Sequence, residues 1–259
     1  MARRIYQACI EKFKYLTALF QIESNRLAYL KATFQYGLGR KILFPETIVR
    51  LRGSRFAARK NSMDIAHLSD YFEPQTTEFL LKLAPKQFID VGAHVGRYSV
   101  LLAQQGAKVI AFEPNDGNYK LLLENIRLNQ LPDKITALNI GCSNVEQHKE
   151  LFCFPSNEGM ASFIKRDGAE TKEVCALKTL DEVCGDLAAV DAIKIDVEGL
   201  ELEVLQGAVK LLANKSPLLI VEIFGSQKEE EISAFLNPFG YSAERILDSR
   251  NYYFVKRPS

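Results

Sequence analysis

The chain of 259 residues lacks most of the features that assign a sequence to a class at first sight. No apolar run approaches the ~18–20 residues that a helix needs to span a bilayer, which argues against a helical membrane protein. Residues 1–16 are basic, but charges interrupt their apolar residues and no small-residue cleavage site follows, so this stretch makes a poor secretory signal. The five cysteines form no CxxC pair and no metal-like spacing, which favours reduced thiols in a cytoplasmic protein.

What the chain does have is the composition of a globular protein, with 47% hydrophobic and 25% charged residues. The net charge of +1 hides an asymmetry between its two parts. Residues 1–60 hold 13 Lys and Arg against three acids, a balance of +10, while the remainder holds 20 against 29, a balance of −9. Opposite signs suggest that the first segment meets something anionic or docks on the acidic body.

The basic first segment is expected to be an extension, residues 1–60, ahead of a main domain over residues 61–259. Residues 3–36 contain no Gly or Pro, and their apolar residues recur at three- and four-residue spacing, which predicts one or two amphipathic helices. Residues 47–62 alternate as a short hairpin would. Three uses of the extension stay open: packing on its own domain or as a homodimer arm, peripheral contact with an anionic membrane through residues 1–45, or nucleic-acid binding.

From residue 87 onward, apolar strands alternate with helical segments, which predicts right-handed crossovers and a mostly parallel sheet. The expected fold class is α/β, a doubly wound sheet of five parallel strands closed by an antiparallel hairpin that turns at residues 249–251. Residues 145–185 interrupt the alternation with two strands that flank a polar loop, residues 156–171. No internal repeat or low-complexity tract is present.

The first strand–turn–helix, "QFIDVGAHVGRYSVLL", marks the place to look for a cofactor, because ligands of such sheets lie beyond the carboxyl ends of the strands. Its loop runs from Gly92 to Gly96, and His94 stands where a G-x-G-x-x-G dinucleotide loop needs its second glycine. A phosphate-gripping G-x-x-x-x-G-K-[ST] loop is absent too. S-adenosylmethionine, which carries no phosphate, fits better: Asp90 can receive its ammonium. Glu113, 21 residues after Gly92, can receive its ribose diol.

Five stretches in order, "FIDVGAHVG", "AFEPN", "LKTLDEV", "IKIDVEGLELEVLQGA" and "LLIVEIF", resemble the FkbM family of S-adenosylmethionine-dependent methyltransferases. The resemblance covers roughly residues 71–225. It implies a seven-stranded methyltransferase fold and transfer of a methyl group, usually to a hydroxyl oxygen of a sugar, a glycan or a polyketide-type metabolite. The stretch "DYFEP" resembles the segment that precedes the cofactor loop in the family, which implies that Glu73 contacts the methionine end of the cofactor. His94 stands where the family often has Asn.

Together these arguments predict a set of cofactor contacts, with Ser143 placed to bond an adenine edge. The residues expected to hold S-adenosylmethionine are Glu73, Asp90, Gly92, Ala93, His94, Gly96, Glu113, Pro114, Ser143 and Asp196.

Methyl transfer needs an aligned acceptor oxygen and a base for its proton. Lys194 and Asp196 are two apart in "IKID" and so share one face of a strand, while Glu222 ends the neighbouring strand. Asp196 could be the general base, with a pKa raised by burial or by Glu222. Alternatively, Asp196 and Glu222 could hold Mg²⁺, or Lys194 and the acids could form a structural ion pair. His94 is a further candidate base, and Glu198 could line the same cleft.

The sequence therefore favours an S-adenosylmethionine-dependent O-methyltransferase that acts on a hydroxyl of a sugar, a glycan or a small metabolite. Two alternatives stay open. One is a nucleic-acid methyltransferase that uses the basic extension as a clamp, and the other is a non-catalytic membrane- or partner-binding protein on a methyltransferase fold. The expected location is the cytoplasm, with peripheral membrane contact left open.

Overall fold

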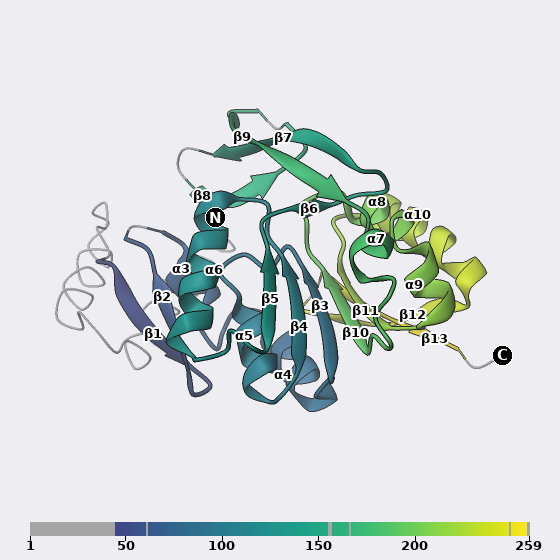
Figure 1. The fold of residues 1–259 in the computed structure, drawn as a ribbon. Helices are drawn as coiled ribbons and strands as arrows, with labels where there is room; N and C mark the ends of the chain where they lie inside the picture. Colours follow the sequence, from purple (N-terminus) through teal and green to yellow (C-terminus); the bar gives the residue numbers. More distant parts are fainter. Residues whose placement is uncertain (1–44, 61, 155–156, 166, 249, 258–259) are drawn as a thin grey trace, which may run out of the picture. The chain divides into compact units, whose positions relative to one another are not determined.

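The computed structural model describes residues 45–60, 62–154, 157–165, 167–248 and 250–257 (Figure 1). The chain divides into two compact units, Met1–Pro74 and Gln75–Ser259. The expected boundary at residue 60 falls inside the first unit, and the helices expected before residue 45 lie outside the described residues. Within the described ranges, no helix is long and apolar enough to cross a bilayer.

The first unit contains the predicted hairpin, which is confirmed. Strands β1 (Thr47–Leu51) and β2 (Ser54–Ala58) pair antiparallel across a two-residue turn. Both turn residues, Arg52 and Gly53, have positive φ, which suits the right-handed twist of a tight hairpin. A single helical turn, α3 (Asp64–His67), follows.

A seven-stranded sheet forms the centre of the second unit, in the order β12-β13-β11-β10-β3-β4-β5. The five strands from β11 to β5 are parallel, and β13 joins β11 antiparallel, so the predicted doubly wound sheet with a terminal hairpin is confirmed. Strand order reverses between β10 and β3, where ligands of this architecture bind. The bounds are β3 (Gln87–Val91), β4 (Lys108–Phe112), β5 (Ile135–Leu138), β10 (Ala192–Ile195), β11 (Leu218–Glu222), β12 (Tyr241–Leu247) and β13 (Asn251–Lys256).

Helices connect the strands of the central sheet, and the structure differs from the expectation at two of them: no helix was predicted at Leu180–Cys184, and the helix predicted over residues 199–214 is divided. The single helix predicted over residues 199–214 is two helices, because Gly207 interrupts it: a Cβ at Gly207 would lie 2.1 Å from the backbone oxygen of Ser143. The helices are α4 (Pro74–Leu83), α5 (Arg97–Gln104), α6 (Asp116–Leu128), α7 (Leu180–Cys184), α8 (Glu201–Gln206), α9 (Val209–Asn214) and α10 (Ser226–Leu236), followed by a 3-10 turn (Asn237–Phe239).

Alternation along the strands separates an apolar face of the sheet from a face that carries the polar side chains. Ile89, Ile193 and Val221 belong to the apolar core cluster that includes residues of α7, α8, α9 and α10. Since successive side chains point to opposite faces, Asp90 and Lys194 lie on the other face, and they are register partners on β3 and β10. Asp90 and Lys194 therefore lie side by side on that face, in the two central strands.

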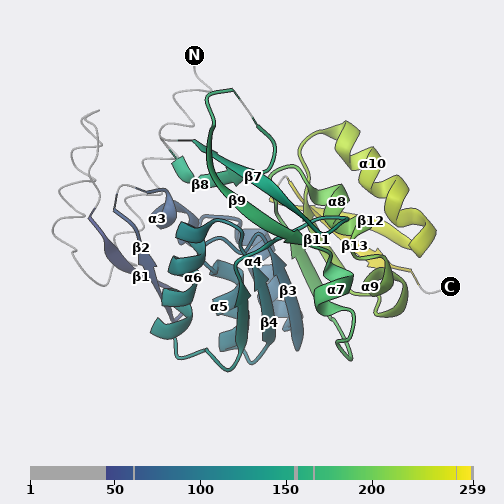
Figure 2. The ribbon, with the colours of Figure 1, turned by 45° about the horizontal axis from the view of Figure 1, so that its top comes forward.

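A second, four-stranded sheet, in the order β6-β9-β7-β8, lies at the carboxyl ends of the parallel strands in both views (Figures 1 and 2). Its apolar residues pack around Leu200, just beyond β10. Two of its strands were predicted, but β8 was expected to be loop because its sequence is polar. The strand predicted over residues 134–143 splits into β5 and β6. The bounds are β6 (Gly141–Cys142), β7 (Gln147–Phe154), β8 (Asn157–Ser162) and β9 (Glu170–Lys178).

Candidate active site

The loop after β3 is held tightly between the ends of β4 and β10. The N–H groups of Gly92 and Ala93 both donate to the Phe112 oxygen, at 3.0 and 2.9 Å, and the Asp196 N–H donates to the Val91 oxygen at 3.0 Å. Gly92 has φ +83, and a Cβ there would lie 1.8 Å from the Asp196 backbone oxygen. Only glycine fits this position, because the backbone of the β10 loop passes directly over it.

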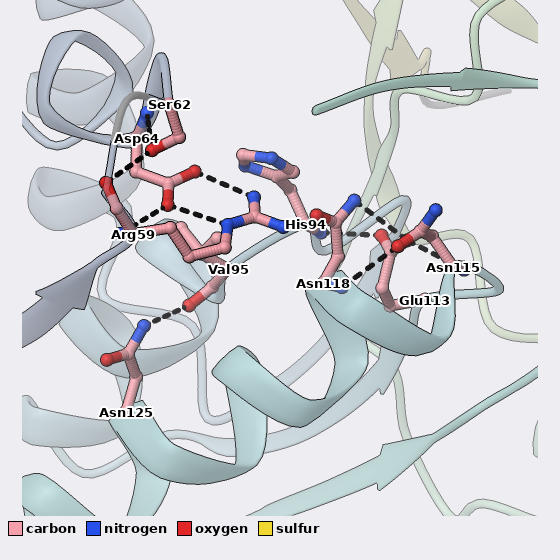
Figure 3. A network of polar contacts seen from close by, with 9 residues as sticks. All are labelled: Arg59, Ser62, Asp64, His94, Val95, Glu113, Asn115, Asn118 and Asn125. Carbon is pink, nitrogen blue, oxygen red and sulfur yellow. Dashed lines mark hydrogen bonds and ion pairs between the residues drawn. The ribbon is translucent and has the colours of Figure 1, made fainter. Parts of the chain in front are cut away.

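Glu113 is the centre of a buried hydrogen-bond cluster at the end of β4 (Figure 3). Its carboxylate accepts from the backbone N–H of His94 at 2.8 Å, from the backbone N–H of Asn115 at 3.0 Å and from the Asn118 amide at 3.3 Å. Burial raises the pKa of Glu113 to about 7, against the lowering effect of these three donors. The group is therefore fixed in place, with a pKa well above that of an ordinary carboxyl group.

Asn118 leaves one buried acceptor beside Glu113. Its amide nitrogen donates to Glu113, and its backbone N–H donates to the side chain of Asn115, which caps α6. The Asn118 Oδ1 atom is buried and has no hydrogen-bond partner among the described residues. Buried polar atoms are almost always paired, so this oxygen suits a donor from outside the chain.

Asp90 lies on the polar face and reaches α5. It accepts a hydrogen bond from the Ser99 hydroxyl at 2.6 Å, in the first turns of that helix. Burial raises the pKa of Asp90, and the Lys194 ammonium opposes this shift. Lys194 is itself buried and lies 5.1 Å from the Tyr98 ring centroid, so the ammonium sits between an aromatic face and carboxylates.

Asp196 and Lys194 form the ion pair at the end of β10, with 2.7 Å between the Lys194 Nζ and the carboxylate. The Lys194 side chain is 3% exposed and that of Asp196 is 27% exposed, so the pair reaches the surface on the Asp196 side. Burial acts to raise the pKa of Asp196, but the Lys194 charge and hydrogen bonds from Glu222 and Lys194 outweigh it and leave the pKa lowered. The expected raised pKa of Asp196 is therefore wrong, and the neighbouring ammonium is the reason.

The turn that follows Asp196 is held by three separate elements. Glu198 and Gly199 both have positive φ. The Ser162 hydroxyl, on β8, donates to the Glu198 oxygen at 2.9 Å, and Lys228, on α10, donates to the Gly199 oxygen at 2.6 Å. The buried Glu201 carboxylate accepts from the Gly199 N–H at 2.7 Å and pairs with Lys228. The four-stranded sheet and α10 thus both fix the backbone that carries Asp196.

The remaining predicted residues are distributed around these groups. His94 has φ +52 and lies close enough to Asp196 for its charge to lower the pKa of Asp196. Pro114 accepts a weak hydrogen bond from the Cys175 thiol on β9. Ser143 is buried, and its hydroxyl points to the Asn144 side chain at 3.3 Å. Glu73 belongs to the first unit, and its contact with the methionine end stays a prediction.

Metal binding gains no support from the side chains. Among the described residues, no group of three or more His, Cys, Asp and Glu side chains could hold an ion. Mg²⁺ held by Asp196 and Glu222 stays a prediction that rests on two carboxylates, one of which already pairs with Lys194.

Sequence reasoning missed the residues that support the predicted ones. Asn115 could have been found from the N-cap position after the strand "VIAFEP", because Asn is a preferred cap. Ser162, Glu201 and Lys228 carry no such signal, since their roles depend on contacts between distant segments.

The described groups fit S-adenosylmethionine by their chemistry. Glu113, Asp90, Asp196 and Asn118 Oδ1 provide acceptors for a ligand that carries hydroxyl and ammonium donors. The glycine loop passes close under another backbone, as Gly92 shows. Neither phosphate-binding loop is present, which suits a ligand without phosphate.

Comparison with known proteins agrees with this chemistry. The profile of the Methyltransferase FkbM domain matches residues 90–252, more than half of the chain. Methyltransferase sdnD of Sordaria araneosa is 29% identical over 46% of this chain and 59% of its own length. Hexuronic acid methyltransferase AglP of Haloferax volcanii is 28% identical over 64% of this chain and 67% of its own length.

The structure is also similar to that of methyltransferase FkbM from Methylobacillus flagellatus KT, with a TM-score of 0.49 and 19% identity over 66% of this chain and 43% of that one. The first of the two curated relatives is thus matched over less than two thirds of its own length. The match of the domain profile begins at Asp90 and ends at Tyr252, so it covers the glycine loop, the Lys194–Asp196 ion pair and the strands up to the start of β13. The chain therefore belongs to the FkbM methyltransferase family.

Proposed function

We propose that the protein is an S-adenosylmethionine-dependent O-methyltransferase that acts on a hydroxyl of a sugar, a glycan or a small metabolite. The observation that carries the proposal is the Glu113 cluster: a buried carboxylate held by three N–H donors beside an unpaired Asn118 oxygen, directly behind the glycine loop. Ionised Glu113 and Asn118 Oδ1 would accept from the ribose hydroxyls. A relative named as a hexuronic acid methyltransferase supports a sugar as the acceptor.

The bound cofactor would supply an electrophilic methyl group. The residues of the chain then have two tasks, to align the acceptor oxygen and to receive its proton, and alignment alone can contribute several kcal/mol. Asp196 is the proposed proton acceptor because it is the exposed member of its ion pair. Its lowered pKa keeps it ionised at neutral pH but makes it a weak base. Alignment is therefore expected to contribute more than proton removal.

Lys194 and Glu222 are proposed to orient Asp196. Lys194 holds one carboxylate oxygen at 2.7 Å, and Glu222 shares a hydrogen bond with the same carboxylate. Asp196 would take the acceptor's proton on its carboxylate and pass it to solvent, because its side chain is 27% exposed. A purely structural ion pair would make the same contacts. Turnover of the Asp196 variant distinguishes a catalytic role from a structural one.

The test is calorimetric titration of the whole chain with S-adenosylmethionine, S-adenosylhomocysteine and NADH. Binding of the two sulfur ligands in the micromolar range, and none of NADH, is expected. Screening of glycosides and hydroxylated metabolites with a labelled methyl donor would then identify an acceptor. Failure of both sulfur ligands to bind would overturn the proposal.

Asp196→Asn is expected to lower turnover on that acceptor by roughly 10²- to 10⁴-fold, the usual contribution of a positioned base, with little change in S-adenosylhomocysteine affinity. Glu203→Gln, on the nearby helix α8, is the matched control and should turn over normally. Normal turnover by Asp196→Asn would rule out the proton-acceptor role.

A further inference from the structure

The carboxyl edge of the sheet has a cofactor side and an opposite side. The glycine loop follows β3 and Glu113 follows β4. Asp196 follows β10 and Glu222 ends β11, on the other side of the point between β3 and β10 where the strand order reverses. A cofactor over β3 and β4 leaves the ends of β10 and β11 and the start of the antiparallel β13 for the acceptor. The side chains on that second side are therefore the ones that meet the acceptor.

Two of those side chains, Phe224 and Arg250, form a pair. The Arg250 guanidinium carbon lies 4.5 Å from the Phe224 ring centroid. The Ile223 N–H donates to the Arg250 oxygen at 2.9 Å, so the backbone holds the two segments together. Phe224 follows Glu222 by two residues, and Arg250 precedes Asn251, the register partner of Glu222. Phe224 and Arg250 thus lie at the same edge of the sheet as Asp196 and Glu222, next to the end of β11.

Both members of the pair are available to a ligand. Phe224 is 40% exposed, and Arg250 is exposed as well. Within the described ranges, the hydrogen bonds of Arg250 are made by its backbone atoms, and its guanidinium makes no ion pair and no hydrogen bond. A stacked guanidinium keeps its planar fork of donors free for a bidentate anion.

We propose that Phe224 and Arg250 form an acceptor subsite for an acidic sugar, in which the pyranose ring lies against Phe224 and its carboxylate is bound by the Arg250 guanidinium. The C–H face of a pyranose is apolar and suits an exposed aromatic ring, and a carboxylate matches the guanidinium fork. The acceptor is thus a uronic acid or a glycan that ends in one. This inference rests on the proposed function and narrows its substrate class.

The test measures binding to the full chain saturated with S-adenosylhomocysteine. The probes are methyl glucuronide, methyl glucoside and glucose phosphate, which differ in the charged group that the sugar carries. The wild-type protein is expected to bind the glucuronide at least about tenfold more tightly than the glucoside, as a charge-assisted hydrogen bond allows. Tighter binding of glucose phosphate than of the glucuronide, or equal binding of glucuronide and glucoside, overturns the proposal.

Variants locate the subsite. Arg250→Gln should weaken glucuronide binding by about 10- to 100-fold and leave glucoside binding unchanged. Phe224→Leu should weaken the binding of both the glucuronide and the glucoside. Arg257→Gln is the matched control. Arg257 is an exposed arginine that follows β13, at the other end of the strand from Arg250, and it pairs weakly with Glu244 at 3.5 Å. Equal effects of Arg250→Gln and Arg257→Gln would overturn the assignment.

Affinity for S-adenosylhomocysteine separates the two levels of inference. If the wild-type protein and all three variants bind it equally, a loss of glucuronide binding belongs to the subsite and not to the fold. If the wild-type protein does not bind it, the proposed function fails, and the subsite fails with it. If it binds and the glucuronide is not preferred, only the acidic-sugar inference fails.

Discussion

At the scale of single residues, two acids of the candidate site are perturbed in opposite directions. Burial raises the pKa of Glu113 to about 7, while the Lys194 ammonium and the Glu222 hydrogen bond overcome burial at Asp196 and lower its pKa. Asp196 therefore adds to the free energy of unfolding at pH values above its ordinary pKa, and this contribution is lost as the pH falls through its lowered pKa in the folded protein. Glu113 does the reverse: its contribution falls as the pH rises from its ordinary value toward about 7.

The Glu113 shift predicts a pH-dependent cofactor affinity. Since the ionised carboxylate of Glu113 is a proposed acceptor for the ribose hydroxyls, S-adenosylhomocysteine affinity should rise as the pH increases through about 7. Calorimetric titration from about pH 6 to about pH 8 measures this rise.

Glu113→Gln should bind about tenfold more weakly and lose the pH dependence, because a neutral amide replaces the titrating group. This variant therefore tests whether Glu113 is the group that causes the pH dependence. A pH dependence that survives in Glu113→Gln would mean that Glu113 is not its cause.

At the scale of elements, the sequence was most informative where a local pattern repeats. The parallel strands, the hairpins and the acid at the end of β4 follow from apolar alternation and spacing alone. The β8 strand and the break at Gly207 were missed, because each depends on a partner distant in the chain: β7 for the strand and the Ser143 oxygen for the glycine. The pKa of Asp196 was missed for the same reason, since a sequence shows the order of charges but not their distances.

Gly92 provides a prediction at this scale. Gly92→Ala places a Cβ 1.8 Å from the Asp196 oxygen in a backbone conformation with φ +83, so the two loops must separate. The variant should lose S-adenosylhomocysteine binding and unfold at lower denaturant concentration, with a cost that exceeds the roughly 1–2 kcal/mol of a left-handed alanine.

Gly106→Ala is the control for this variant. Its φ is +105, but a Cβ there would meet nothing within 4 Å. It should show the conformational cost alone and keep the ligand. Equal destabilisation by both substitutions would mean that the contact between the loops after β3 and β10 is unimportant.

At the scale of the whole molecule, ligand binding and stability are linked. A ligand held only by the folded chain stabilises it by about 2.7 kcal/mol when present at about a hundred times its dissociation constant. For a unit of this size such a gain corresponds to a rise in Tm of roughly 5–10 °C.

Thermal unfolding with and without S-adenosylhomocysteine should show this rise in the wild-type protein. The rise should shrink in Glu113→Gln at the same ligand concentration, and NADH should produce none. An NADH-dependent rise would indicate a dinucleotide site in place of the proposed one.

The position of β13 has a consequence for how the protein is made. This strand is the last of the sheet in sequence, yet it lies inside the sheet, between β11 and β12. During synthesis β11 therefore emerges with a bare edge, and so does every shortened chain that lacks β13. Unpaired apolar edges recruit strands from other chains. Premature termination near residue 250 should thus yield aggregates rather than a smaller folded protein.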